Sequence, residues 1–230
     1  MNYEIISDLA QIKRFVATLN QDEKYIVQLA IRNKYANFKV NKNHNVLRSE
    51  SLLPKNIEAF IKQLQSPIGS FQTHDGQVIK DSTGFVIFIS VNSMNEDKFY
   101  RLVASDLTDK IINNKQHHKS LNGYLLSQQL KSNNREVVDI EFDYPNPEMG
   151  DMIKYQVLKS LNFNKDIVRF IKTRGGMHVL IKFNEIEECV KRTAIRQIKE
   201  MEYVDVATAR MSVAIPGTLQ GSHPVIMLEN

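Results

Sequence analysis

The sequence has one cysteine, Cys189, among its 230 residues. A single cysteine excludes an internal disulfide framework and a zinc cluster built from several thiolates. No apolar run approaches the roughly 20 residues that span a bilayer, and the first residues lack the apolar segment of a signal peptide. No G-x-x-x-x-G-K-[ST] loop is present, so a P-loop ATPase is not indicated. These absences lead us to expect a cytoplasmic protein in a reduced compartment, with no membrane segment.

What the chain does have is a basic charge balance. Its net charge is +4, its pI is about 9.0, and 42% of its residues are hydrophobic. That hydrophobic content is enough for one sizeable core, or for a core with an additional subdomain. The excess of positive charge favours an anionic partner such as nucleic acid.

The positive charges are concentrated in two windows without acids, residues 24–48 and 110–135. In the first window, aromatic side chains are interleaved with the cations. Cations hold a phosphate backbone and aromatic rings stack on bases, so this window is a candidate nucleic-acid interface. The alternative interpretation is a solvated basic face. The candidate nucleic-acid-binding residues are Arg32, Lys34, Tyr35, Lys39 and Lys42.

Hydrophobic periodicity predicts alternating helices and strands. Helices are predicted over 7–20, 54–65, 95–113, 122–131, 150–161 and 185–201. Strands are predicted over 85–91, 136–142, 166–171, 179–183, 204–206 and 212–215, and residues 25–31 fit either a strand or the start of a helix. The alternation indicates a mixed α/β fold whose sheet is at least partly antiparallel. Residues 132–134 could separate an N-terminal unit, 1–132, from a C-terminal unit, 133–230.

The segment 137–143, which overlaps the predicted strand over 136–142, carries an acid at every second position from Asp139. Side chains two apart share one face of a strand, so Asp139, Glu141 and Asp143 lie together, opposite an apolar face. Neighbouring carboxylates repel one another, and hard divalent cations relieve that repulsion. Two such ions can activate a 3′-hydroxyl and stabilise a leaving pyrophosphate. A solvent-facing strand with alternating acids is the alternative.

A glycine-containing turn, Thr173–His178, follows later in the chain. The pair Gly175 and Gly176 permits positive φ and a close approach of a ligand to the backbone. Arg174 can fork onto phosphate oxygens, and His178 can donate to another oxygen. The alternative is a hairpin turn whose histidine lies at the surface.

A third segment comprises Asp205 on a short apolar strand and the turn at Pro216–Gly217. Asp205 could be a further metal ligand, and a strand-end cap is its alternative role. The Pro-Gly turn could shape a nucleotide pocket, with Arg210 and His223 nearby.

Taken in order, the three segments resemble the three signatures of the archaeo-eukaryotic primase (primase-polymerase) superfamily. That family carries an acidic D-x-D/E strand, an S/T-x-R/G-G-x-H turn, and an h-D strand followed by a Pro-containing loop. The corresponding residues here are Asp139 to Glu141, Thr173 to His178, and Val204 with Asp205. The specific match covers residues 137–223, and the N-terminal half resembles small mobile-element members more loosely.

The resemblance implies a fold and a set of site residues. The fold is α/β (α+β), with an RRM-like mixed sheet as catalytic core packed against an N-terminal α/β unit. Asp139, Glu141 and Asp205 would be catalytic and would bind two Mg²⁺ or Mn²⁺ ions. The nucleotide-binding residues would be Thr173, Arg174, Gly176, His178, Arg210 and His223.

The chain also departs from the family pattern. Gln220 stands where the family often has histidine, and Ser222 stands where a lysine is expected. The cysteine-rich zinc insert of the cellular primase subunit is absent. Asp143 offers a second register for the metal pair, and we prefer Asp139 with Glu141 because Asp143 abuts the Tyr144-Pro145 turn.

The function implied is a DNA primase-polymerase, a metal-dependent nucleotidyltransferase that uses NTP or dNTP on a single-stranded DNA template. Such members of the family act in DNA replication, often with a helicase or another replication protein as partner. Two alternatives from other classes are a non-catalytic single-stranded nucleic-acid-binding module and a metal-dependent nuclease that uses the same acids.

Overall fold

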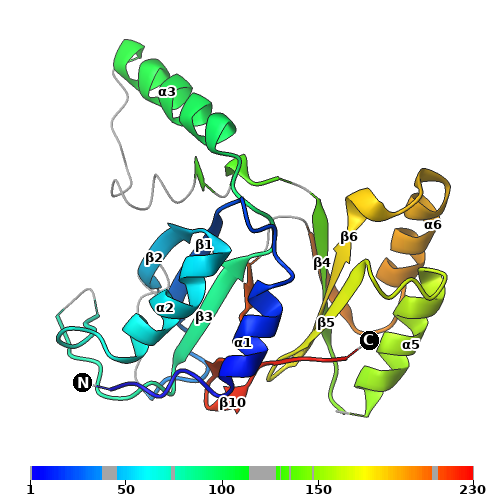
Figure 1. Cartoon of the computed structure of the whole chain (residues 1–230), viewed down its shortest axis with the longest axis horizontal. Coiled ribbons are helices and arrows are strands. Elements are labelled where there is room, and N and C mark those ends of the chain that lie inside the picture. Colours follow the sequence, from blue (N-terminus) through cyan, green and yellow to red (C-terminus); the bar gives the residue numbers. More distant parts are fainter. Residues whose placement is uncertain are drawn as a thin grey trace.

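The computed structural model describes residues 2–37, 46–73, 76–113, 128–129, 131–134, 136–146, 148–208 and 212–229. Within these residues the chain forms five α-helices, two larger antiparallel sheets and a short two-stranded hairpin (Figure 1). This is a mixed α+β architecture. Every strand pairing among the described residues is antiparallel, in agreement with the predicted sheet that is at least partly antiparallel, and not with the mixed sheet that the resemblance implies.

The first sheet has the strand order β2-β1-β3-β8. Its strands are β1 (Tyr25–Ile31), β2 (Val46–Leu52), β3 (Phe85–Ser90) and β8 (Ser212–Ala214). Six of the seven residues of β1 and five of the six of β3 are buried, as near-continuous apolar runs predict. The ambiguity over residues 25–31 is resolved as a strand because this segment pairs on both sides. β2 is polar at most positions and was not expected from its sequence.

Helix α2 (Pro54–Gln65) covers this sheet (Figure 1). Proline at the first helical position suits a helix start, because its missing N–H would have no partner there. The helix buries its apolar stripe, which comprises Ile57, Phe60, Ile61 and Leu64. Its bounds are those that the sequence predicts.

Helix α1 (Leu9–Val16) is shorter than the predicted helix over 7–20. Asp8 caps it, accepting hydrogen bonds from Ala10 N at 2.8 Å and Gln11 N at 3.3 Å. The carbonyl oxygen of Gly217 accepts from the backbone N–H groups of Ser7 and Asp8. Gly217 has a φ of +85°, and a Cβ there would lie 2.2 Å from the Asp8 carbonyl oxygen. The Pro216–Gly217 turn therefore supports the start of α1. For the same turn, the sequence predicts a role in shaping a nucleotide pocket.

The second sheet has the order β11-β5-β6-β4-β7. Its strands are β4 (Val137–Asp143), β5 (Val168–Lys172), β6 (Gly176–Lys182), β7 (Val204–Thr208) and β11 (Ile226–Met227). Helices α5 (Met149–Ser160) and α6 (Glu188–Lys199) cover one face, and a single 3₁₀ turn, η2 (Phe183–Glu185), follows β6. Their apolar side chains join Ile140, Phe142 and the other residues of that face in one core.

The opposite face of the second sheet turns towards the first sheet and α1. Ile171 of β5 and Leu180 of β6 belong to the same buried cluster as Ile12 and Phe15 of α1. The buried side chain of Asn92 joins the two halves, because it accepts from Glu136 N and Val137 N and donates to the Val137 carbonyl. β8 lies beyond residue 133, yet it completes the first sheet, and β11 belongs again to the second, so the chain crosses between the two sheets three times.

Helix α3 (Glu96–Ile112) extends away from the body of the molecule (Figure 1). Asn95 begins it, accepting from Lys98 N at 2.9 Å. Residues 132–134 return to its base, where Asn134 bonds to Ser93. Most of the predicted helix over 122–131 lies outside the described residues. Within the described ranges, no helix combines the length and apolar character needed to cross a membrane.

Candidate functional site

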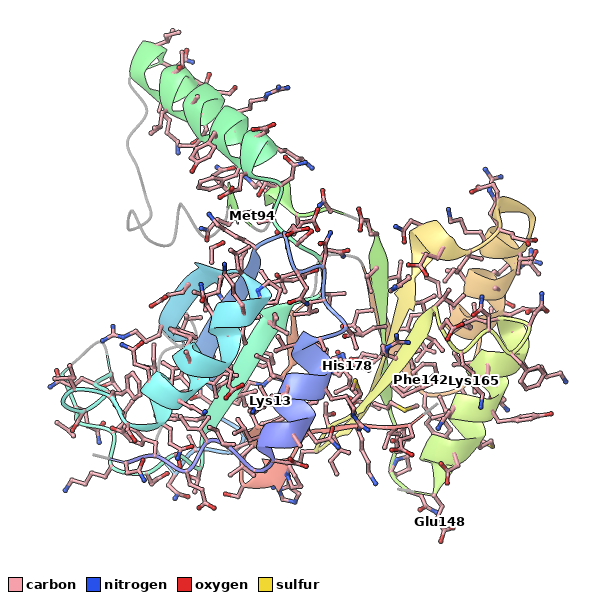
Figure 2. All side chains as sticks on the ribbon, viewed as in Figure 1. Lys13, Met94, Phe142, Glu148, Lys165 and His178 are labelled. Carbon is pink, nitrogen blue, oxygen red and sulfur yellow. The ribbon has the colours of Figure 1, made fainter. Side chains whose placement is uncertain are left out.

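The candidate site lies on the face of the second sheet that is turned towards the first. Asp139, Glu141 and Asp143 alternate along β4, and β6 places His178 directly opposite Glu141. Figure 2 labels His178 near the middle of the molecule, where the two halves meet, while Phe142 belongs to the opposite, helix-covered face. The side chains of β4 therefore alternate between the two faces of the sheet, as the sequence predicts.

Asp139 and His178 are bonded to each other. The imidazole Nδ1 lies 3.0 Å from each carboxylate oxygen of Asp139, and both residues are buried. The other ring nitrogen, Nε2, lies 3.8 Å from Oε1 of Glu141. The resemblance implies that Asp139 binds a metal ion and that His178 binds phosphate, and the structure brings the two together as a carboxylate–imidazole pair.

Burial and neighbouring charges have opposite effects on the pKa of His178. Burial by itself lowers the pKa of His178, but the Asp139 hydrogen bond and the charges of Asp139, Glu141 and Asp143 outweigh it. The pKa of His178 is therefore raised above its ordinary value, which favours the imidazolium form.

Glu141 is half-buried among like charges. Burial raises the pKa of its carboxyl, the charge on His178 opposes that rise, and the charges of Asp139, Asp143 and Asp205 add to it. A bound cation would relieve this repulsion, so the surroundings of Glu141 suit a positive ligand.

A β-bulge sets the position of Asp205 on β7. Glu141 pairs with Val206 and Phe142 pairs with Val204, which leaves Asp205 as the extra residue. Val204 packs against the helix-covered core, and Asp205 is exposed. Without the bulge, strand alternation would place Asp205 opposite Phe142, facing that core. Because of the bulge, the Asp205 carboxylate does not face the core, and its charge acts on Glu141.

The fit of this group to a metal ion is partial. Its oxygen donors and mutual repulsion are those of a hard divalent site. In the part of the chain that the structure describes, however, no three His, Cys, Asp or Glu side chains are gathered closely enough to hold an ion. The bond to His178 uses one donor, and a carboxylate has about four lone-pair positions, so Asp139 keeps acceptor capacity.

The Thr173–Gly176 turn closes next to the last acid of β4. Thr173 N donates to the Gly176 carbonyl at 2.9 Å. Neither glycine of the pair has positive φ. Gly176 is required because a Cβ there would lie 1.9 Å from the Phe142 carbonyl oxygen, whereas a Cβ on Gly175 would meet only Asp143 Oδ1, at 3.5 Å. The close approach predicted for a ligand at Gly176 is thus an approach of the neighbouring strand.

Arg174 is exposed and contacts the hairpin formed by β9 (Leu219–Gln220) and β10 (His223–Pro224). Its backbone N–H donates to Gln220 Oε1 at 3.1 Å, and its guanidinium Nη1 donates to the Gly221 carbonyl at 3.2 Å. Nδ1 of His223 lies 3.0 Å from the same oxygen. One carbonyl therefore holds two of the predicted nucleotide-binding side chains together.

The backbone conformation of the hairpin tip is set by its two central residues, Gly221 and Ser222. Gly221 has a φ of +56° and Ser222 a φ of +65°, which are the left-handed values of a tight two-residue hairpin turn. The sequence analysis assigns no contact to Gln220 or Gly221. The Gly221-Ser222 pair, a residue combination that favours a tight turn, is the signal from which this hairpin could be predicted.

The predicted nucleic-acid-binding residues are only partly within the described chain. The guanidinium of Arg32 lies 5.6 Å from the centre of the Phe88 ring, and the ammonium of Lys34 lies 5.1 Å from that of Tyr35. The Tyr35 ring also faces Arg174. Lys39, Lys42 and Arg210 lie outside the described residues.

A cavity of about 360 Å³ opens on the same sheet face, at the end of β4 away from Asp143. Leu180, which pairs with Asp139, and Val137 line it from the second sheet, and Phe15 lines it from α1. Lys182 and Glu185 also line it and form an ion pair at 2.8 Å. The acids therefore lie between a cavity with a mixed polar and apolar lining at one end of the strand and the Arg174 turn at the other.

No protein-family model, curated protein or solved structure matches this chain.

Proposed function

We propose that this protein is a primase-polymerase of the archaeo-eukaryotic type, a metal-dependent nucleotidyltransferase acting on single-stranded DNA. The observation that carries the proposal is the arrangement of charge on one sheet face. The charge of Asp205 on β7 acts on Glu141 of β4, and the Arg174 turn begins where β4 ends, with Gly175 beside Asp143. Nucleotidyl transfer requires acids for metal ions next to cations for a triphosphate.

The topology of the second sheet supports the RRM-like part of this proposal. Its elements follow the order β4-α5-β5-β6-α6-β7, and the strands lie in the order β5-β6-β4-β7. This is a β-α-β-β-α-β unit with both helices on one face. In RRM domains the sheet face that the helices leave uncovered carries the residues that stack on RNA bases. Here the corresponding face carries the candidate acids and is turned towards the first sheet.

In the proposed reaction, a 3′-hydroxyl attacks the α-phosphate of an incoming nucleotide, and pyrophosphate leaves. Glu141 and Asp205 would hold the divalent ions, with Asp139 contributing the lone pairs that His178 leaves open. When bound, Mg²⁺ or Mn²⁺ ions lower the pKa of the attacking hydroxyl and stabilise the leaving oxygen. Arg174 and His223 bind the triphosphate, and His178 holds the Asp139 carboxylate in a fixed orientation.

A second candidate is a non-catalytic single-stranded nucleic-acid-binding module. The bond between Asp139 and His178 favours it, because an acid paired with an imidazolium is partly neutralised without any metal. This candidate predicts DNA binding that is indifferent to divalent ions, which fluorescence anisotropy during a metal titration would reveal.

A primer-extension assay and a de novo synthesis assay, each run with ribo- and deoxynucleotides and with Mg²⁺ or Mn²⁺, test the proposal. We expect template-dependent synthesis by the wild type and none by Asp139→Ala, with DNA binding nearly unchanged. Asp166→Ala, which removes an exposed acid from the loop before β5, is the matched control and should stay active. Metal-dependent synthesis by Asp139→Ala would disprove the site assignment.

A separate assay tests the nuclease alternative. End-labelled DNA is incubated with metal but without nucleotides, and a nuclease would shorten this DNA.

A further inference from the structure

Tyr35 joins the N-terminal basic window to the Arg174 turn. It lies in the turn after β1, where its backbone N–H donates to the Arg32 carbonyl at 2.9 Å. The guanidinium carbon of Arg174 lies 4.5 Å from the centre of the Tyr35 ring, and Lys34 Nζ lies 5.1 Å from it. Two cations far apart in the sequence therefore share one aromatic ring.

The hairpin tip fits closely against this ring. A Cβ on Gly221 would lie 2.5 Å from Tyr35 Cγ and 2.8 Å from Arg174 Nη1. The Gly221 backbone thus occupies the space beside both side chains, and its carbonyl accepts from Arg174 and contacts His223. The position of the Arg174 guanidinium is therefore fixed by the Tyr35 ring and by the backbone of Gly221.

The cations of this cluster have no acidic partner in the described structure. No ion pair of Lys34, Arg174 or His223 with a carboxylate is recorded there. The interaction of a cation with a ring leaves its charge uncompensated, unlike a salt bridge. Arg174 is exposed, and within the described residues only its Nη1 and its backbone N–H donate to protein acceptors. The remaining donors are available to an external anion.

We propose that Tyr35 is a positioning residue for a polyphosphate site, and that its ring holds Arg174 and Lys34 ready for the triphosphate of a nucleotide. The identity of the ligand as a nucleoside triphosphate rests on the proposed function, while the anion site rests on the contacts alone. By this proposal both halves of the molecule contribute to the nucleotide site: the first half supplies Tyr35 and Lys34, and the second sheet supplies the acids.

Equilibrium binding of inorganic tripolyphosphate, measured by calorimetry in EDTA, tests the site without catalysis. Tyr35→Phe keeps the ring and should bind within about 2-fold of wild type, whereas Tyr35→Leu should bind roughly 3- to 30-fold more weakly. Tyr35→Leu should add little to a variant that already carries both Arg174→Ala and Lys34→Ala, because Tyr35 acts through these two cations. Equal losses in the Phe and Leu variants, unchanged binding in Tyr35→Leu, or an additive loss in the triple variant would overturn the proposal.

Gly221→Ala provides a second, independent perturbation. The added methyl would displace Tyr35 and Arg174, so we expect tripolyphosphate binding to weaken. Gly69→Ala is its control, because Gly69 also has positive φ, at +87°, but has open space around it. Both variants carry the backbone strain, and only Gly221→Ala should lose anion binding; equal affinity in the two would count against the proposal.

Kinetics separate this proposal from the proposed function. In an active enzyme, Tyr35→Leu should raise KM for the nucleotide roughly 3- to 30-fold with kcat little changed, and Tyr35→Phe should restore it. Wild-type synthesis with an unchanged KM in Tyr35→Leu would reject the role of Tyr35 alone. Tripolyphosphate binding that depends on Tyr35, without any synthesis by the wild type, would reject the proposed function alone.

Discussion

The imidazole of His178 bonds to Asp139 and not to the acid directly opposite it. Strand pairing places Glu141 across from His178, yet Nδ1 lies 3.0 Å from both oxygens of Asp139, the diagonal neighbour. Nε2 is left 3.8 Å from Glu141. One imidazole therefore lies between two acids of the same strand, and its protonation affects both.

This pair predicts that stability depends on pH. The pKa of His178 is raised in the folded protein, so folding favours its protonated form. The resulting stabilisation is fully present below the unfolded pKa of about 6.5 and is lost as pH rises through the higher folded pKa. Asp139→Asn removes the largest of the interactions that raise the pKa of His178, so the free energy of unfolding of this variant should fall less over the same range. Urea unfolding in EDTA at several pH values measures the difference between the two proteins. A steeper decline in the variant would contradict the prediction.

Divalent ions should stabilise the protein if the acids bind them. Because the charges of Asp143 and Asp205 help to raise the pKa of Glu141, a cation in their midst removes an existing repulsion. At about 10-fold above its dissociation constant, Mg²⁺ or Mn²⁺ should raise the Tm by about 3–6 °C, and EDTA should reverse this. Asp205→Asn should reduce the shift and Asp166→Asn should preserve it, as differential scanning fluorimetry would show. Equal shifts in both variants would remove Asp205 from the metal site.

Gly176 should tolerate no side chain, and its neighbour provides the control. Alanine at 176 would place a Cβ 1.9 Å from the Phe142 carbonyl oxygen, so β4 and β6 would have to separate. We expect Gly176→Ala to lower the free energy of unfolding by at least about 2 kcal/mol. Gly175→Ala meets only Asp143 Oδ1, at 3.5 Å, and should cost much less. Chemical denaturation of both variants tests the contrast, and similar losses would show that this part of the hairpin is packed differently.

Asn92 should fix the second sheet against the first. Its side chain is buried and makes three hydrogen bonds to the backbone of Glu136 and Val137, at 2.7 to 3.0 Å. Asn92→Ala leaves those groups without these partners, which should cost about 1–3 kcal/mol and reduce any activity that needs both halves. Asn113→Ala, at the exposed end of α3, removes only bonds to Asp109 within the same helix and should cost less. A stable and fully active Asn92→Ala would show that packing alone aligns the sheets.

Much of the local structure could be predicted from residue periodicity. The helix over 54–65 and the strand over 85–91 follow from an apolar stripe and an apolar run, and Asp8 is a cap that its residue type suggests. β2 could not be predicted in this way, because its residues are mostly polar and its pairing with β1 is a long-range contact. The candidate acids on β4 were predictable as a group, since strand alternation alone puts them on one face.

The sequence by itself determined which residue types are near one another along a strand or turn: three acids at alternate positions, an arginine before two glycines, and an apolar core face behind them. Only the tertiary structure decided their partners. The packing of β4 against β6 paired Asp139 with His178, a bulge turned Asp205 out of the core, and a hairpin tip brought Gly221 beside Tyr35 and Arg174. The physical reason is that alternation and propensity act over a few residues, whereas register, bulges and contacts between segments depend on packing across the whole chain.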